Sequence, residues 1–202
     1  MSRRRKRGST CRAITKTRDY EDTRELSRRL TLWSKAFKCK GRRFLICSGG
    51  GPGIMEAANR GASEAKGDNI GLCISLPGEP SGNSFITRQL SFMFHYFFMR
   101  KFWLLYMAKA MVIMPGGFGT LDEFAEALTL IQTMEMKKNM PIVLFGTEYR
   151  NQVINFEPMV KFGMISPEDV DLFYATHPVD DAFDLITKEL QTHAIEHPGV
   201  SL

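Results

Sequence analysis

Short apolar runs that end at glycine-rich turns, each followed by a helical pattern, restrict the fold of this sequence more than any other feature. The run 44–47 stops at Ser48-Gly49-Gly50-Gly51-Pro52-Gly53, and the run 111–114 stops just before Gly116-Gly117-Phe118-Gly119. Two more short apolar runs stand at 70–76 and 142–145. The segments with helical spacing are 19–37, 54–65, 92–109, 120–136, 148–162 and 179–192. Buried parallel strands are short continuous apolar runs connected by helices. We therefore predict an α/β fold, a Rossmann-like parallel sheet with helices on both faces in a single domain.

The basic residues are concentrated at the start of the chain. Six of them fall in the first twelve of 202 residues, and without these six the formal net charge of +5 becomes −1. They are Arg3, Arg4, Arg5, Lys6, Arg7 and Arg12. We expect residues 1–18 to form a basic, disordered tail and residues 19–202 to form the folded Rossmann-like domain. Because nucleic-acid binding requires a basic face, we do not expect nucleic acid as a partner of the nearly neutral body.

Cysteine usage and the N-terminal sequence favour a cytoplasmic protein. Cys11, Cys39, Cys47 and Cys73 show no C-x-x-C spacing, and the last two lie in apolar runs, so we expect reduced core thiols. The arginine cluster is not followed by the apolar stretch of a signal peptide. These observations predict a reducing, cytoplasmic setting.

The apolar stretch 92–107 is too short and too charged to cross a membrane. Arg100 and Lys101 interrupt it, and a membrane span needs about 20 apolar residues. We expect a helix that is buried or lies in an interface, and no membrane partner. Since one sheet in a chain of this size cannot easily cover a helix that is apolar all round, we expect a homodimer.

Both glycine loops are candidate anion sites. Each lies where a predicted strand ends and a helix begins, so free backbone N–H groups there can meet a phosphate. The dinucleotide fingerprint fails because positions 54 and 122 hold Ile54 and Asp122, and no Walker lysine follows, which disfavours NAD(P) and P-loop NTPase chemistry. Two loops in one sheet favour a mononucleotide-sized site, although tight strand-to-helix turns alone would also explain them. The glycines proposed to bind phosphate or ribose are Gly49, Gly50, Gly51, Gly53, Gly116, Gly117 and Gly119.

Arg100 and Glu123 form a candidate functional pair. A charge such as Arg100 in an apolar helix is costly to bury unless a carboxylate or a phosphate lies near it. Glu123 has a second, structural interpretation, because Thr120 and Glu123 match the T-x-x-E capping box. The spacing leaves the functional and the capping interpretations open.

The same residues carry a resemblance to a known family. Met99-Arg100-Lys101 and the segment Pro115-Gly116-Gly117-Phe118-Gly119-Thr120-Leu121-Asp122-Glu123 resemble the M-R-K and P-G-G-x-G-T-x-x-E motifs of the LOG (LONELY GUY) phosphoribohydrolases. The segment from Ser48 to Glu56 is similar to that family's first glycine loop, and the resemblance extends over residues 44–149. It implies a Rossmann-like fold and a homodimer with composite active sites. Many members are labelled lysine decarboxylase, but nothing here resembles a lysine-centred pyridoxal phosphate motif.

The resemblance implies hydrolysis of the N-glycosidic bond of a nucleoside 5′-monophosphate to free base and ribose 5-phosphate. AMP and cytokinin riboside 5′-monophosphates are the implied substrates, and neither a metal nor a cofactor is expected. Arg100 and Glu123 would be catalytic, while Glu56, Lys101 and Thr120 would join the glycines in binding phosphate and ribose. The alternatives are a non-catalytic carrier of a nucleotide or of a phosphorylated cofactor such as the molybdenum cofactor, and a dimer whose site has lost its function.

One region departs from the family. Members usually begin with a strand that ends in a Gly-Ser turn and helps to bind the nucleotide, whereas residues 2–17 are polar and basic here. The segment 10–14 is too short and too charged for a central strand. Either this first strand is degenerate or the start of the chain is altered.

Overall fold

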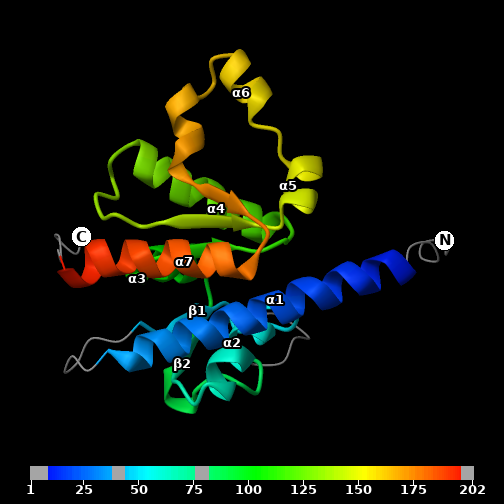
Figure 1. Ribbon diagram of the computed structural model, residues 1–202, viewed down its shortest axis with the longest axis vertical. Coiled ribbons are helices and arrows are strands. Elements are labelled where there is room, and N and C mark those ends of the chain that lie inside the picture. Colours follow the sequence, from blue (N-terminus) through cyan, green and yellow to red (C-terminus); the bar gives the residue numbers. More distant parts are fainter. Residues whose placement is uncertain (1–8, 38–43, 76–81, 197–202) are drawn as a thin grey trace.

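The chain forms two parallel β-sheets flanked by helices (Figure 1). The computed structural model describes residues 9–37, 44–75 and 82–196. Its first half contains α1 (Ser9–Ala36), β1 (Ile46–Ser48), α2 (Ile54–Glu64), β2 (Asn69–Ile74), the 3₁₀ turn η1 (Arg88–Leu90) and β3 (Ser91–Phe94). The second half begins with α3 (Phe97–Met107), β4 (Met111–Ile113), α4 (Phe118–Gln132) and β5 (Ile142–Phe145). It continues with α5 (Thr147–Val153), α6 (Glu157–Lys161), η2 (Pro167–Leu172), β6 (Tyr174–Thr176), α7 (Val179–Leu190) and the π-helical turn η3 (Gln191–Glu196).

All strand pairs are parallel. One sheet has the order β1-β2-β3, with Cys47 opposite Ile70 and Cys73 opposite Met93. The other has the order β4-β5-β6, with Val112 opposite Val143. The predicted α/β class with parallel strands between helices is confirmed. The strands, however, form two three-stranded sheets, and β1 and β4 are not paired with each other.

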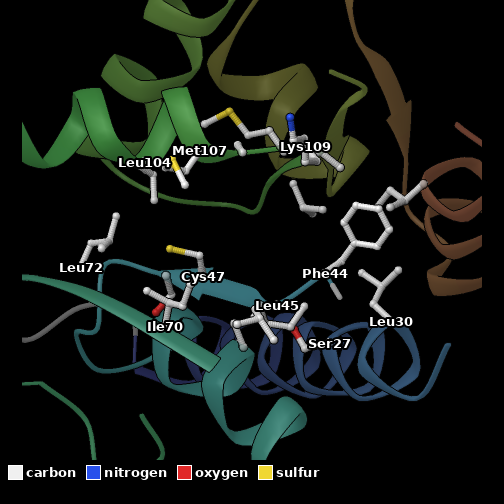
Figure 2. Close-up of a pocket in the computed structure, with 18 of the residues that line it drawn as sticks. Ser27, Leu30, Phe44, Leu45, Cys47, Ile70, Leu72, Leu104, Met107 and Lys109 are labelled. Carbon is white, nitrogen blue, oxygen red and sulfur yellow. The ribbon is translucent and has the colours of Figure 1, made fainter. Parts of the chain in front are cut away.

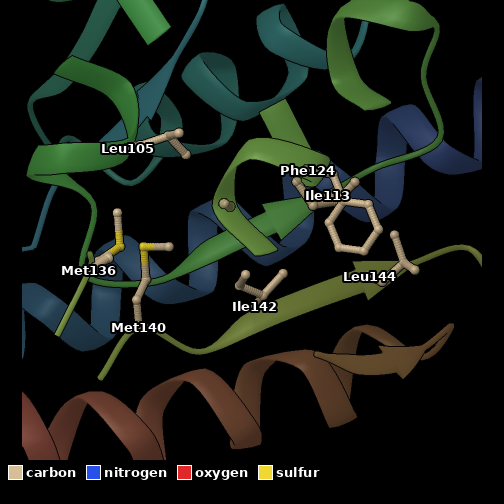
Figure 3. Close-up of a cluster of buried hydrophobic side chains, with 8 residues drawn as sticks. Leu105, Ile113, Phe124, Met136, Met140, Ile142 and Leu144 are labelled. Atoms are coloured by element: carbon tan, nitrogen blue, oxygen red, sulfur yellow. The ribbon is translucent and has the colours of Figure 1, made fainter. Parts of the chain in front are cut away.

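The core lies on both faces of β5. All four residues of this strand are buried. Ile142 and Leu144 pack with Leu105 of α3 and Phe124 of α4 on one face (Figure 3). Val143 and Phe145 belong to a second cluster, whose members from α7 and α1 are Ala182, Ile186, Leu190 and Leu26. A continuous apolar run thus marks a strand that is covered on both sides, as predicted for 142–145.

Helix α1 connects the two halves of the molecule. It packs along α2 and also contacts α7, which lies beside it in Figure 1. The α1–α2 contact is close because Gly61 has no side chain, and a Cβ there would overlap the carbonyl oxygen of Arg24. Two buried hydroxyls on α1 are satisfied within the helix, since Thr23 and Thr31 donate hydrogen bonds to the carbonyls of Asp19 and Ser27. None of the described helices is long and apolar enough to cross a membrane.

Several predicted elements differ in their bounds. Helix α1 begins at Ser9, so residues 9–18 are helical where the sequence predicted a tail, while residues 1–8 lie outside the described residues. The helix predicted for 92–109 is a strand, β3, followed by α3, because Ser91–Phe94 pairs with the free edge of β2. The helix predicted for 148–162 is two short helices, α5 and α6, and β6 was missed. Tertiary pairing overrides local periodicity in short apolar segments such as these.

Candidate functional site

The two glycine loops follow the carboxyl ends of β1 and β4. We call residues 48–53 loop 1 and residues 115–119 loop 2. Both loops line one cavity of about 2010 Å³, to which loop 1 contributes Gly49 and Pro52 and loop 2 contributes Pro115 and Gly116. Thr120 and Glu123, from the first turns of α4, line it as well. The two loops that the sequence singled out therefore face a common space at the edge where parallel sheets bind ligands.

Arg100 lies between loop 1 and helix α4. It lies on α3, and its Nη2 is 3.1 Å from Glu123 Oε1 on α4. On the other side, its Nη1 would be 3.2 Å from a Cβ at Gly49, so the guanidinium lies against loop 1. The Arg100 side chain is 14% exposed and that of Glu123 is 21% exposed. The expectation that a carboxylate lies near Arg100 is confirmed.

One donor of Arg100 has no partner in the described part of the chain. Its Nε is buried and makes no hydrogen bond there. A buried charged donor left unpaired is costly, which makes this N–H a candidate contact for an anionic ligand.

Glu123 is not part of a capping box. Helix α4 begins at Phe118 with Gly117 as its N-cap, so Thr120 is already the third helical residue and no side chain caps the helix. The capping interpretation of Glu123 is therefore wrong, because the N-cap is Gly117, three residues before the Thr120 that the T-x-x-E pattern indicates. Burial raises the pKa of the Glu123 carboxyl, and the nearby Arg100 opposes this rise.

Loop 2 presents an open helix N-terminus. The amides of Thr120 and Leu121 bond to the Gly117 carbonyl, so those of Phe118 and Gly119 precede the first hydrogen bond of the helix. A Cβ at Gly117 or Gly119 would meet nothing within 4 Å. The space beside these two glycines can therefore hold a ligand that approaches the backbone.

Loop 2 is held from behind by α5. Tyr149 donates a hydrogen bond of 2.5 Å to the Gly116 carbonyl oxygen. Gly146 has a φ of 82° and packs against Pro115 of loop 2. A Cβ on Gly146 would lie 2.6 Å from Pro115 Cγ. These contacts restrain the loop on its inner side and leave its amide side free.

Loop 1 is filled by the protein itself. A Cβ at Gly50, where φ is 73°, would overlap Cys73 Sγ, and a Cβ at Gly51 would be 2.5 Å from Met55 Cε. Gly53 has a φ of 76° and is the N-cap of α2, with open space beside its Cα. Most glycines of this loop are thus required by neighbouring side chains or by the backbone conformation.

A buried network of polar side chains braces loop 1. Asn59 accepts hydrogen bonds from Ser48 Oγ at 2.7 Å and from Asn83 Nδ2 at 2.9 Å, and its own amide donates to Asn69. Asn83 also donates from its side chain to the Gly50 and Gly51 carbonyls. The sequence analysis missed these residues. Asn59 on the buried face of an amphipathic helix was the available signal.

Two proposed site residues are engaged elsewhere. Lys101 Nζ lies 2.9 Å from Asp122 Oδ2 and 2.5 Å from Glu126 Oε2. Glu56 accepts a hydrogen bond of 3.0 Å from Tyr20 on α1. The structure therefore brings Glu123, Gly49, Gly116 and Thr120 together around one cavity and places Arg100 against Gly49 and Glu123. The polar ends of Lys101 and Glu56 bind other side chains.

Comparison with known proteins places the chain in a family. Residues 55–187 match the family model described as "Possible lysine decarboxylase". A similar curated protein is the probable cytokinin riboside 5′-monophosphate phosphoribohydrolase LOG4 of Oryza sativa subsp. japonica, which is 26% identical over 146 residues. That alignment covers 71% of this chain and 61% of the rice protein, so the chain spans about three-fifths of its relative.

Two solved structures share the fold. The protein TM1055 has a TM-score of 0.57 at 24% identity, with 87% of this chain and 89% of that chain covered. The molybdenum cofactor carrier protein of Chlamydomonas reinhardtii also has a TM-score of 0.57, at 19% identity, with 86% and 89% covered. The family match extends from the end of loop 1 through Arg100 and Glu123 to α7. The chain therefore belongs to the family described as possible lysine decarboxylases, which is the LOG family.

Proposed function

We propose that the chain hydrolyses the N-glycosidic bond of a nucleoside 5′-monophosphate, with AMP or a cytokinin riboside 5′-monophosphate as the substrate. The observation that carries this proposal is the partly buried Arg100–Glu123 pair, which lies against loop 1 and on the helix that follows loop 2. Such a site offers an anion contact on one side and a fixed carboxylate on the other. This is the combination that cleavage of a phosphorylated riboside requires.

The 5′-phosphate binds at loop 2 in this proposal. The free amides of Phe118 and Gly119 lie at the N-terminus of a 15-residue helix, whose dipole favours negative charge. The unpaired Nε of Arg100 supplies a further donor. Loop 1, which is rigidly braced, forms the opposite wall of the site.

Glu123 acts on the ribose in this proposal. As the bond from C1′ to the base nitrogen breaks, the base leaves with the bonding electrons and the sugar becomes oxocarbenium-like. The Glu123 carboxylate stabilises that positive charge and orients a water molecule. The water oxygen bonds to C1′, and the proton that the water loses ends on the base nitrogen that left with the bonding electrons, which gives ribose 5-phosphate and the neutral base. Arg100 counteracts the effect of burial on the Glu123 pKa and so favours the ionised carboxylate at neutral pH.

A second copy of the chain would cover an exposed apolar surface in this proposal. Strand β3 and helix α3 expose a large apolar surface. Its members that do not line the cavity are Met93, Tyr96, Phe97, Phe98, Met99, Phe102 and Tyr106. This surface is continuous with the site, because the Phe97 ring centroid lies 5.4 Å from Arg100 Cζ. We expect an isologous dimer through α3. Sedimentation that reports a monomer at micromolar concentration would contradict it.

Release of adenine from AMP tests the function, and Glu123→Gln tests the mechanism. The glutamine keeps the size of the side chain but removes its charge, so turnover should fall about 100-fold or more while AMP binding persists. Glu126→Gln is the matched control, since Glu126 lies one turn further along α4 and pairs with Lys101. This control should retain turnover.

The outcomes separate the enzyme from a carrier. Adenine release by the wild type and the control, but not by the Glu123 variant, supports the proposal. A rise in melting temperature with AMP but no adenine would instead support a non-catalytic nucleotide or cofactor carrier. Wild-type turnover in Glu123→Gln would show that the carboxylate has no part in the chemistry.

A further inference from the structure

Two consecutive basic residues of α3 pair with three carboxylates of α4. Arg100 pairs with Glu123, whereas Lys101 lies between Asp122 and Glu126. The Lys101 ammonium is 2.9 Å from Asp122 Oδ2 and 2.5 Å from Glu126 Oε2, and its side chain is only 20% exposed. Lys101 therefore holds the two carboxylates that precede and follow Glu123 along α4.

Lys101 lies outside the cavity that Glu123 and Thr120 line. Hydrogen bonds to Asp122 and Glu126 raise the pKa of the Lys101 ammonium, so it stays protonated at neutral pH. These contacts give Lys101 a fixed positive charge beside α4. They favour a different role from the phosphate binding that the resemblance implies for this residue.

The Glu123 carboxyl lies among several charged or titratable groups of α3, α4 and β1. They are Arg100, Lys101, Asp122, Glu126 and Cys47. Burial is the main cause that raises the pKa of Glu123, and the two neighbouring carboxylates raise it further because like charges repel. The two cations of α3 lower it. Among the described residues, Lys101 is the cation that pairs with Asp122 and Glu126. Its charge therefore acts on Glu123 directly and also compensates both neighbours.

Cys47 on β1 adds no charge to this group. Its thiol lies at the wall of the cavity (Figure 2) and is exposed, which corrects the expectation of a core thiol, whereas Cys73 is buried as expected. Desolvation, and then the negative charge of Glu123, raise the pKa of the Cys47 thiol to about 12. The thiol is therefore neutral at pH 7. The ionisation of Glu123 thus depends on the charged groups of α3 and α4.

We propose that Lys101 is a positioning residue, which keeps the Glu123 carboxylate ionised and paired with Arg100 by neutralising Asp122 and Glu126. This inference rests on the proposed function only in giving that carboxylate a catalytic task. Loss of Lys101 would leave two uncompensated carboxylates beside Glu123. Loss of Glu126 alone would leave Lys101 paired with Asp122, which is consistent with retained turnover in Glu126→Gln.

The ionisation of Glu123 tests this role without any need for enzymatic activity. Glutamate labelled with ¹³C at the side-chain carboxyl reports each pKa by NMR, and the signal of Glu123 is the one that is missing in Glu123→Gln. Lys101→Met removes the charge and keeps an unbranched side chain, so the pKa of Glu123 should rise by about half a unit or more. Lys101→Arg keeps the positive charge and should keep the wild-type pKa. Lys161→Met on α6 is the control and should also leave this pKa unchanged.

A variant that lacks the neighbouring carboxylates as well separates charge from packing. Lys101→Met combined with Asp122→Asn and Glu126→Gln removes one positive and two negative charges, so the pKa of Glu123 should return to the wild-type value or fall below it. A lysine with a merely structural role would change the melting temperature and leave this pKa unchanged. An unchanged pKa in Lys101→Met, or a triple variant whose pKa stays as high as in Lys101→Met, would overturn the proposal.

A second variant keeps the test decisive if Lys101→Met does not fold. Asp122→Asn leaves Lys101 paired with Glu126 and removes one negative charge beside Glu123. The pKa of Glu123 should therefore fall in this variant. A pKa that does not fall would contradict the compensation of charge on which the proposal depends.

AMP binding and adenine release distinguish positioning from contact with the phosphate. At pH 8, where Glu123 is ionised in every variant, Lys101→Met should bind AMP within about threefold of the wild-type affinity. A larger loss would place Lys101 on the phosphate and overturn the proposal. On the acid side, kcat of Lys101→Met should begin to fall at a higher pH than in the wild type, with KM unchanged. If the wild type releases no adenine, the proposed function fails, whereas the NMR titration still decides the role of Lys101.

Discussion

The two glycine loops begin alike in sequence but serve different purposes in the structure. In loop 1 the space beside Gly50 and Gly51 is filled by Cys73 and Met55, and buried asparagines hold the backbone. In loop 2 the space beside Gly117 and Gly119 is empty, and the amides at the start of α4 are free. The same residue type thus lies against packed side chains in one loop and beside open space in the other. Arg100 lies between loop 1 and helix α4, which follows loop 2.

The largest expected effect on stability is at the network behind loop 1. Asn59→Ala removes the acceptor of the Ser48 hydroxyl and of one Asn83 hydrogen bond, and it removes the donor to Asn69 Oδ1. We expect the free energy of unfolding to fall by about 3 kcal/mol, since each buried group left unpaired costs about 1–3 kcal/mol. Urea denaturation measures this change. A loss below about 1 kcal/mol would show that water replaces the network and that loop 1 is not rigidly braced.

Alanine substitutions at one glycine of each loop should have different effects on stability and on AMP binding. Gly117→Ala meets open space, so it should leave stability almost unchanged and weaken AMP binding about tenfold by placing a methyl group where the phosphate lies. Gly50→Ala is the matched change in loop 1. It should lower the melting temperature, because φ is 73° and Cys73 occupies the space. Calorimetry measures the melting temperature and the AMP affinity of each variant. Unchanged AMP affinity in a folded Gly117 variant would show that the glycines of loop 2 serve turn geometry alone.

A smaller effect is expected where α5 holds loop 2. Tyr149→Phe removes the hydroxyl that donates to the Gly116 carbonyl. Loss of one exposed hydrogen bond should lower the free energy of unfolding by about 1 kcal/mol or less. If the substitution destabilises the protein as much as Asn59→Ala does, loop 2 is as firmly braced as loop 1, and the contrast between them fails.

The smallest expected effect is on the pH dependence of stability, and it arises from Glu123 on the helix that follows loop 2. Burial holds the pKa of Glu123 above its ordinary value, whereas the bracing residues of loop 1 are neutral. Just above the ordinary pKa of a glutamate, the folded state binds more protons than the unfolded state, so the contribution of Glu123 to stability decreases as pH rises. Denaturation between pH 4 and 7 should show a shallower decrease in Glu123→Gln than in the wild type. An identical slope would indicate a carboxyl group with no raised pKa.

Much of this organisation can be predicted from sequence, and the exceptions share a cause. The buried strand 142–145 and the start of helix α2 at Ile54 were predicted correctly, because continuous apolar runs and helical periodicity are local signals. Strand β3 was mistaken for the beginning of a helix, since its pairing with β2 depends on residues twenty positions away. The capping box at Thr120 failed for a similar reason, because the helix begins at Phe118 and Glu123 binds Arg100 instead.

The sequence by itself determined the α/β class, the position of both glycine loops at strand ends and the need for an acidic group near Arg100. Each of these follows from local pattern or from the cost of burying a charge. Tertiary structure decided which carboxylate meets Arg100, which loop is filled and which is open, and that β1 and β4 face each other across a cavity instead of pairing. These features depend on contacts between residues that are distant along the chain. The residue spacing within one segment does not predict the energies of such contacts.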